Sequence, residues 1–486
     1  MATLAQQHPE TEALIVRSEK VTPAIIDALP NLRTVVRAGA GYNTIDIKYA
    51  RRKNVDVMNT PGANSIATAE LTTSLPAYGA SASSSITVEE LLLQRVVGLA
   101  AGYEDLNDHD TLRTDPVFAL VAGKSDLEGE ARRRQEDRGK PLAGKSTLNR
   151  LELTPRRVAE DERYKKIECD EFKVGEFWLE EFSRSRRGKV RRLILDLDRT
   201  GFPLHGNQEG RHFLSYYDEY VYFPLYIFCD DMPLVARLQT GDRAAWNGVA
   251  SELAYLIPRL RQRFPGVRIV VRGDSAFAVE QIMGFCEEIG VDYVFGLPKN
   301  PTLERELEGT MSRAEKAFKN TQTTSKEFCE FHYKTRETWS KERRVIGKAE
   351  FGSNGPNPRF VVTSLSRRAG RAIRMYEEWY CQRCDMENRI KEQLQLFADR
   401  MSVHVKRANQ LRMWFSTVAY IILAHLRRFA LTGTTLARAE AATIRLRLLK
   451  IGARVTISAR RIYFSMASAF PLQQVFAAAH RNLLRI

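Results

Sequence analysis

The 486-residue sequence predicts an α/β protein in which helices cover a mixed β-sheet. Three apolar runs follow one another closely, as consecutive strands do, at residues 191–198, 220–228 and 234–238. Helix-like and strand-like segments then alternate, at residues 244–264, 267–272, 278–289 and 293–297. Consecutive strands followed by alternating helices and strands are typical of a mixed sheet with helices on its faces.

The first 70 residues predict a separate, small α/β fragment. Its order is strand, helix, strand, turn, helix and strand, ending at Val57. It resembles the start of D-3-phosphoglycerate dehydrogenases and related 2-hydroxyacid dehydrogenases, on residues 13–19, 36–41 and 58–64. The resemblance ends near Glu70, and the pair Gly39 and Gly41 lacks the third glycine of a dinucleotide-binding fingerprint. We therefore expect neither dehydrogenase activity nor bound NAD.

Composition points to a polyanionic partner. The net charge is +15 and the pI is about 9.5, and each Lys or Arg placed on a DNA phosphate releases condensed counterions. The alternative is a generally basic, well-solvated surface. Six scattered cysteines indicate a reducing compartment. No signal peptide is expected. No membrane span is expected either, because the longest apolar run, 413–426, is too short to cross a bilayer. We expect a cytoplasmic, nucleoid-associated bacterial protein.

Three acidic residues lie in settings that suit metal ions. Asp198 ends the run 193–197, Asp274 ends the run 267–273, and Glu387 lies in a helical stretch. Ligands gather at the carboxyl ends of strands in such sheets. Mg²⁺ prefers carboxylate oxygens and keeps positions open for water and phosphate, and a pair of such ions can hold both reacting oxygens of a phosphodiester. Asp196 faces the same side of its strand as Asp198, so either acid is a candidate ligand.

Beyond a Ser- and Ala-rich junction at 71–86, the chain resembles a bacterial insertion-sequence DDE transposase over residues 87–478. The resemblance depends on the order and spacing of short stretches, which are 102–110, 112–116, 148–152, 195–200, 205–210, 272–275, 387–392 and 396–400. It implies that Asp198, Asp274 and Glu387 are the catalytic metal ligands and that Asp196 has a supporting role. It also implies two divalent ions, Mg²⁺ or Mn²⁺, and a ribonuclease H-like core with a β-rich insertion.

On this resemblance the chain divides into further parts. We expect a helical DNA-binding domain at 87–185, a catalytic core at 186–300 and 366–410, a β-rich insertion at 301–365, and a basic helical C-terminal domain at 411–486. About 110 residues separate Asp274 from Glu387, far more than a connection needs, which supports the insertion.

Several residues are candidate DNA contacts. Tyr380, Arg383 and Glu387 share one helix face, so Arg383 would hold a phosphate in bidentate fashion and Tyr380 would position it. The related signature has a Lys seven residues past the Glu, where this chain has Leu394; Lys391, one turn past Glu387, is a substitute.

Two further groups extend this list of contacts. Trp339, next to Arg336, is either a base-stacking residue or a buried core residue. Residues 401–461 contain twelve basic residues and one acid, Glu440, which predicts a DNA-backbone clamp that includes Lys406, Arg407 and Arg412.

Two motifs are weak evidence for a site, and two departures from the related proteins bear on activity. Residues 139–146 match a P-loop, but a basic, unburied segment precedes them, so ATP binding is not expected. Cys381 and Cys384 form a lone C-x-x-C without a second pair for zinc. Ala276 stands where the related proteins usually have Gly, and Cys384 where they have a small residue.

The sequence therefore predicts a Mg²⁺-dependent transposase that cuts the ends of an insertion sequence and joins them to target DNA. In the expected reaction a metal-activated water frees a 3′-hydroxyl, which then attacks target DNA. The expected partners are double-stranded DNA, as terminal inverted repeats and target, and a second copy of the chain in the synaptic complex. The alternatives are a catalytically inactive DNA-binding remnant and a metal-dependent nuclease that does not join strands.

Overall fold

The structure is a computed structural model that describes residues 10–16, 20–37, 45–59, 86–155, 167–186, 188–215, 217–457 and 461–485. The chain divides into two compact units. Unit 1 comprises residues 1–169, 395–397 and 415–486, and unit 2 comprises residues 170–394 and 398–414. The division at residue 169 falls inside the segment 87–185 that the sequence analysis treats as one domain, and unit 1 combines N-terminal and C-terminal segments.

Unit 2 is built on an eight-stranded sheet with the order β12-β13-β14-β11-β10-β4-β8-β9. Its strands are β4 (Arg192–Arg199), β8 (Leu225–Cys229), β9 (Met232–Arg237), β10 (Arg268–Gly273), β11 (Asp292–Leu297), β12 (Ser325–Tyr333), β13 (Arg343–Gly352) and β14 (Gly355–Thr363). β10 pairs in parallel with both β4 and β11, and the other neighbours are antiparallel. The predicted mixed sheet is confirmed, and the carboxyl ends of β4 and β10 lie at one edge.

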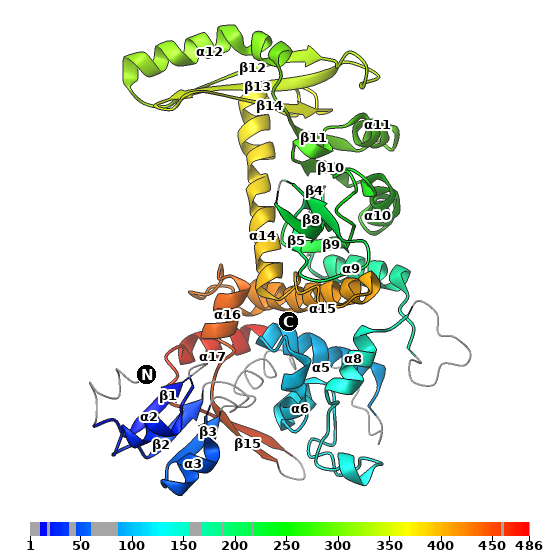
Figure 1. Cartoon of the computed structure of the whole chain (residues 1–486). Helices are drawn as coiled ribbons and strands as arrows, with labels where there is room; N and C mark the ends of the chain where they lie inside the picture. The colour runs from blue at the N-terminus through cyan, green and yellow to red at the C-terminus, as the bar shows by residue number, and fades with distance from the viewer. Residues whose placement is uncertain are drawn as a thin grey trace. The chain divides into compact units, whose positions relative to one another are not determined.

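Helices cover both faces of this sheet (Figure 1). α10 (Val249–Arg263) and α11 (Glu280–Glu288) lie on one face, and α14 (Cys384–Gln395) lies on the other. α10 turns the buried side chains Leu253, Leu256 and Leu260 inward at helical spacing, which is why this segment forms an amphipathic helix. α9 (Glu171–Arg184) contacts the edge strand β9.

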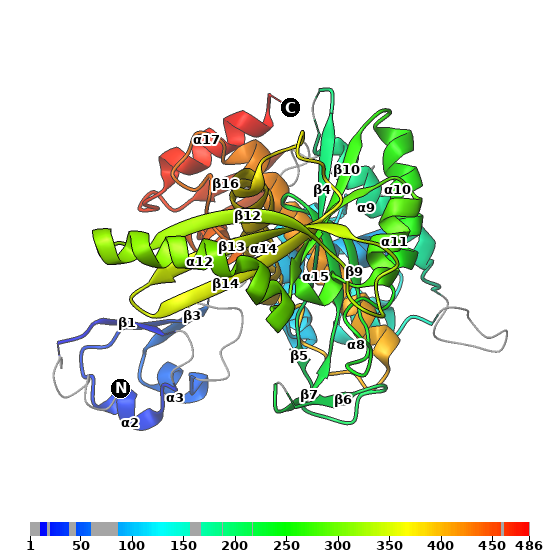
Figure 2. The ribbon, with the colours of Figure 1, turned by 90° about the horizontal axis from the view of Figure 1, so that it is seen from above.

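The run predicted as one strand at 220–228 is two strands. β7 (Glu219–Tyr222) belongs to a small three-stranded sheet with β5 (Phe202–Pro203) and β6 (His212–Leu214), whereas β8 begins at Leu225. Figure 2 shows this small sheet apart from the large one. The break falls at Pro224, which has no N–H to donate to a strand ladder.

The insertion between β11 and α14 begins with a helix that the sequence analysis did not predict. α12 (Pro301–Thr321) starts at the side chain of Asn300, which accepts from the backbone N–H groups of Thr302 and Leu303, and Pro301 suits a first helical turn. α12 packs on β12 and β13 (Figure 2). β14 pairs with β11, so the strands of the insertion continue the core sheet.

Unit 1 contains short helices joined by buried polar side chains. Its helical elements are α5 (Val88–Ala101), η1 (Leu106–Asp108), α6 (His109–Leu112), α7 (Pro116–Val121), η2 (Gln135–Asp137), α8 (Lys145–Glu152), η6 (Leu426–Ala430), α16 (Ala441–Arg447) and α17 (Gln473–Leu483). α15 (Lys406–His425) spans both units. α5 begins with a capping box between Thr87 and Glu90. The Arg95 guanidinium donates to Glu152 at 2.7 Å, and both side chains are buried.

Two other parts of unit 1 are β-structure. The N-terminal fragment has a parallel sheet of β1 (Ala13–Val16), β2 (Thr34–Arg37) and β3 (Asp56–Asn59), with α2 (Pro23–Asp27), α3 (Ile47–Arg52) and a hydrophobic core of its own. The expected turn at 38–41 and the junction at 71–86 lie outside the described residues except residue 86. β15 (Ala453–Ile457) and β16 (Ile462–Met466) form an antiparallel hairpin where the sequence analysis expected helix.

Among the described residues, no helix combines the length and apolar character that crossing a bilayer requires.

Candidate active site

The two aspartates end neighbouring parallel strands. Arg272 of β10 pairs in register with Asp196 of β4. Asp274 and Asp198 each lie two residues further on, and side chains two residues apart share one face of a sheet. Asp198 therefore lies near the carboxyl end of β4, and Asp274 directly follows the adjacent parallel strand β10.

Asp274 also caps the short 3₁₀ helix η3 (Ser275–Phe277), because its Oδ1 accepts from the backbone N–H of Ala276 at 2.9 Å. Ala276 is not among the residues with a positive φ, so its backbone does not require the glycine that the related proteins usually have.

Asp196 is held in a buried ion pair. The Arg272 guanidinium donates to both of its carboxylate oxygens, with Nη2 at 2.7 Å from Oδ2, and the two side chains are 5–6% exposed. The third donor of Arg272, Nη1, lies 2.6 Å from the carbonyl oxygen of Trp379. Asp196 therefore serves to join strands and helix, and both of its carboxylate oxygens accept from Arg272.

Glu387 reaches the same edge of the sheet through a broken helix. A π-helix, η4 (Met375–Tyr380), is followed by one 3₁₀ turn, η5 (Cys381–Arg383), and then by α14. Arg383 bridges two of the predicted acids: Nη1 lies 3.5 Å from Asp198 Oδ2 and Nη2 lies 3.2 Å from Glu387 Oε1. The structure thus brings Arg383 and Glu387, which lie one helical turn apart, next to Asp198 near the end of β4.

The electrostatics place Asp274 in the same neighbourhood. Burial raises the pKa of the Asp198 carboxyl to about 6, the Arg383 charge opposes that rise, and the charges of Asp274 and Glu387 add to it. Burial also raises the pKa of the Tyr380 hydroxyl, and Arg383 and Asp274 act on it as well. Negative charges that disfavour one another are a setting in which a cation is stabilising.

The donor set fits a divalent cation in kind. Asp198, Asp274 and Glu387 supply the carboxylate oxygens that Mg²⁺ prefers. Their arrangement around Arg383 is wider than a metal centre: within the described part of the chain, no three His, Cys, Asp or Glu side chains are grouped closely enough to hold one ion. The expected convergence of the three acids is therefore partial, with a guanidinium between two of them.

A small pocket adjoins Asp274. It has a volume of about 180 Å³ and is lined by Ser275, Gly296, Lys299, Arg359, Tyr376 and Tyr380 among others. Gly296 is necessary for this arrangement, because a Cβ there would lie 2.5 Å from Tyr380 Oη and 3.1 Å from the backbone nitrogen of Ser275. Tyr380 consequently lies directly over the backbone of β11.

The other predicted DNA contacts lie on separate elements. Trp339 is 5% exposed and packs edge-on against Tyr333, so the structure favours the buried alternative over base stacking. Arg336 is exposed in the loop between β12 and β13, and Lys391 is exposed on α14 one turn past Glu387.

The basic residues of α15 and beyond are partly engaged within the protein. Arg407 pairs with Glu171 at 3.0 Å, Arg412 donates to Ser402, and the backbone N–H of Lys406 donates to Glu209. Further along, Arg427 donates to a main-chain carbonyl at 3.1 Å and Arg445 to another at 3.0 Å. Part of the predicted DNA clamp therefore stabilises the fold.

The two weaker motifs lie in different parts of the fold. The P-loop-like stretch follows the 3₁₀ helix η2 and leads into α8, and Asp110 accepts from the backbone N–H of Lys145 at 3.1 Å. A carboxylate thus occupies the end of α8 where a phosphate would bind. Cys381 is exposed, whereas the side chain of Cys384 lies outside the described residues.

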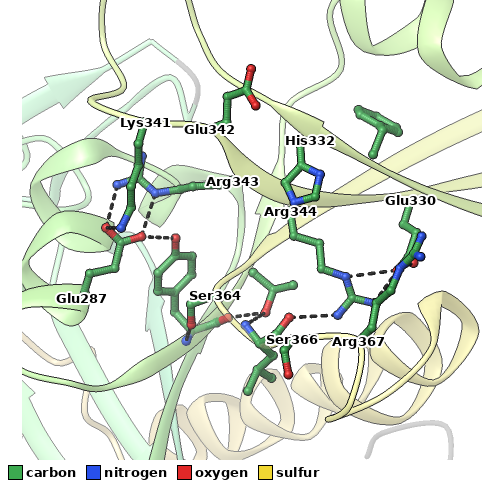
Figure 3. Close-up of a pocket in the computed structure, with 14 residues that line it drawn as sticks. Glu287, Glu330, His332, Lys341, Glu342, Arg343, Arg344, Ser364, Ser366 and Arg367 are labelled. Carbon is green, nitrogen blue, oxygen red and sulfur yellow. Dashed lines mark hydrogen bonds and ion pairs between the residues drawn. The ribbon is translucent and has the colours of Figure 1, made fainter.

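A second, larger pocket of about 440 Å³ lies at the other end of β11, near Tyr293 (Figure 3). Its basic side chains are neutralised in place: Arg343 pairs with Glu287 at 2.9 Å, and Arg344 pairs with Glu330. These pairs connect α11 and β12 to β13, so the pocket has a structural explanation and does not resemble a phosphate site.

Arg272 is a buried residue beside the predicted acids to which the sequence analysis assigned no role. The signal was present, since a charged residue inside the apolar run 269–272 and another inside 193–197 are each costly to bury without a partner.

Comparison with known proteins identifies the class. A family model described as transposase DDE domain group 1 matches residues 63–486, and the chain belongs to that family. The match begins about twenty residues before the start expected at residue 87. Among solved structures, the synaptic complex of piggyBac transposase with hairpin DNA is similar over 87% of this chain and 79% of that one, with 12% identity and a TM-score of 0.37. The family match alone carries the assignment.

The N-terminal stretch is similar to other proteins. A 2-hydroxyacid dehydrogenase of Staphylococcus haemolyticus is 46% identical over 72 residues, which are 15% of this chain and 23% of that protein. Hydroxypyruvate reductase of Thermotoga maritima is 48% identical over 64 residues, 13% of this chain and 21% of that protein. D-3-phosphoglycerate dehydrogenase of Rattus norvegicus is 52% identical over 64 residues, 13% of this chain and 12% of that protein. The chain spans a quarter or less of the length of these relatives.

Proposed function

We propose that this member of the family is a Mg²⁺-dependent DNA transposase that cuts the ends of an insertion sequence and joins them to target DNA. The observation that carries the proposal is the meeting of β4, β10 and α14, where Arg383 contacts Asp198 and Glu387 while Asp274 ends the neighbouring strand. In this proposal Asp198, Asp274 and Glu387 hold two divalent ions, Mg²⁺ or Mn²⁺.

The proposed core is ribonuclease H-like. Its five strands have the order β9-β8-β4-β10-β11, and β8 alone runs antiparallel to the others. Acids at the carboxyl ends of the two central strands and on a later helix suit this architecture.

The residues around the acids have separable roles. Arg383 would exchange its carboxylate partners for a DNA phosphate, which its planar fork can hold in bidentate fashion. Tyr380 lines the pocket beside Asp274 and would position the strand, and the exposed Lys391 would add charge one turn beyond Glu387. The bound ions would activate the attacking water and stabilise the leaving 3′-oxygen. The freed 3′-hydroxyl would attack target DNA, and two chains would hold the two ends.

A strand-cleavage assay tests the proposal. The full chain is incubated with Mg²⁺ and DNA that carries the terminal inverted repeats, and compared with Asp274→Ala. The matched control is Asp292→Ala, which removes a partly exposed carboxylate at the start of β11, away from the carboxyl ends of the strands. We expect cleavage and joined products from the parent and the control, and neither from Asp274→Ala. Equal cleavage by all three chains would contradict the proposal, and cleavage without joining would indicate a nuclease.

The second candidate is a DNA-binding remnant without activity. It is favoured by Leu394 in place of the expected Lys and by the guanidinium between two of the acids. DNA binding in a gel-shift assay, with no cleavage by any chain, would establish it.

A further inference from the structure

Arg272 links the two strands that carry the predicted aspartates to the π-helical turn η4, which precedes the helix of Glu387. It lies on β10 two residues before Asp274, and its partner Asp196 lies on β4 two residues before Asp198. Its remaining contact, from Nη1 to the carbonyl oxygen of Trp379 at 2.6 Å, reaches the residue before Tyr380 on η4. One buried side chain thus connects both strand ends to the helix that leads to Glu387.

The chemistry of this contact requires a guanidinium. Two parallel N–H donors match the two carboxylate oxygens of Asp196, and Nη1 points to Trp379. A Lys ammonium carries the same charge but has one nitrogen, so it cannot hold a carboxylate in bidentate fashion and a carbonyl in fixed directions together.

The contact falls where the helix changes its geometry. The π-helical turn Met375–Tyr380 gives way to a 3₁₀ turn before α14 begins. Such irregular turns change the direction of a helix. They also change which backbone carbonyl groups can accept hydrogen bonds from side chains. The ring of Trp379 also lies under the guanidinium of Arg192, 4.6 Å from its centroid, so β4 holds this residue from a second side.

We propose that Arg272 is a positioning residue: by binding Asp196 and the Trp379 carbonyl at once, it sets the distance between the strand-borne Asp198 and Asp274 and the helix-borne Glu387. The role in metal binding rests on the proposed function, whereas the effect on the helix does not.

The test uses the full chain and three variants, and Asp274→Ala is added for the metal-binding measurement. Arg272→Lys keeps the charge and removes the fork. Asp196→Asn with Arg272→Gln removes both charges, so that no unpaired charge remains buried. The matched control is Arg268→Gln with Asp292→Asn, which removes a more exposed ion pair between β10 and β11 with its nitrogen and oxygen 2.9 Å apart.

The first measurement is hydrogen exchange of the backbone amides of residues 375–387. In both Arg272 variants we expect exchange there to accelerate at least about tenfold, with β11 protected as in the parent and the control unchanged. Unchanged protection of residues 375–387 would overturn the proposal, and so would equal acceleration throughout unit 2, which would indicate a general structural role.

The second measurement is binding of Mn²⁺, followed by the electron paramagnetic resonance signal of the free ion. We expect both Arg272 variants to bind at least about tenfold more weakly than the parent. Parent-like Mn²⁺ binding together with a loosened helix would overturn the proposal. If the parent binds no better than Asp274→Ala, the proposed function fails and hydrogen exchange alone decides the role of Arg272.

Discussion

The buried pair of Asp196 and Arg272 makes a quantitative prediction for stability. Arg272→Gln leaves a carboxylate that is 5% exposed without its counter-charge. Removing one partner of a buried ion pair costs about 3–5 kcal/mol, because the remaining charge stays desolvated. In the double variant with Asp196→Asn no charge is stranded, and the two amides can retain a hydrogen bond. We expect a loss of about 1–2 kcal/mol there.

The two numbers define a coupling free energy. If Asp196→Asn alone costs about 2 kcal/mol, because the buried guanidinium loses its counter-charge but keeps an amide oxygen and the Trp379 carbonyl as acceptors, the single losses exceed the double loss by about 3–6 kcal/mol. The chain has two units, so a single global unfolding transition is not a safe measure. The assay is native-state hydrogen exchange of the β10 amides at increasing urea concentration. Additive single losses, with coupling below about 0.5 kcal/mol, would refute the reasoning.

Three further predictions follow from particular contacts. His109 is fully buried, and burial lowers its pKa from 6.5 to about 3, with Arg95 acting in the same direction. The folded state therefore resists protonation of His109, and the stability that is present above pH 6.5 is lost as the pH falls. We expect the free energy of unfolding of unit 1 to fall by about 2 kcal/mol between pH 6.5 and 5. In chemical denaturation, His109→Gln should reduce this dependence of the unfolding free energy on pH. In Gly296→Ala the added methyl group displaces Tyr380 from the backbone of β11. We expect the cleavage rate to fall about 10²-fold while DNA affinity in a gel-shift assay is unchanged. A cleavage rate like that of the parent would contradict the positioning role of Tyr380. Trp339→Ala removes a buried ring, so we expect the free energy of hydrogen exchange in β12 and β13 to fall by about 3–5 kcal/mol. A loss of DNA affinity without any loss of stability would instead favour base stacking by Trp339.

The sequence was sufficient for the elements whose signal is local. The apolar runs that end at Asp198 and Asp274 mark strands β4 and β10. The helix α12 was not predicted, although the asparagine and proline at 300 and 301 are a local signal for its start. The hairpin of β15 and β16 was missed because its short alternating segments were interpreted together with the neighbouring basic helices.

The site was harder, because its geometry depends on contacts between distant residues. Asp196 and Arg272 are separated by 76 positions, and only the sheet register brings them together. The π-helical turn before α14 has no propensity signature of its own, so the direction of the helix that carries Glu387 could not be derived. Trp339 shows the same limit, since a Trp flanked by basic residues suits a core as well as a DNA surface.

Iron-mediated backbone cleavage tests the central claim most directly. Fe²⁺ in place of Mg²⁺ reduces added hydrogen peroxide to hydroxyl radicals, which cut the chain next to the bound ion, and ascorbate returns the iron to Fe²⁺. The fragments are mapped by mass spectrometry. We expect cuts near residues 198, 274 and 387 in the same sample, suppressed by excess Mg²⁺ and absent in Asp274→Ala. Cuts confined to one of the three segments, or cuts that persist in Asp274→Ala, would contradict the shared metal site.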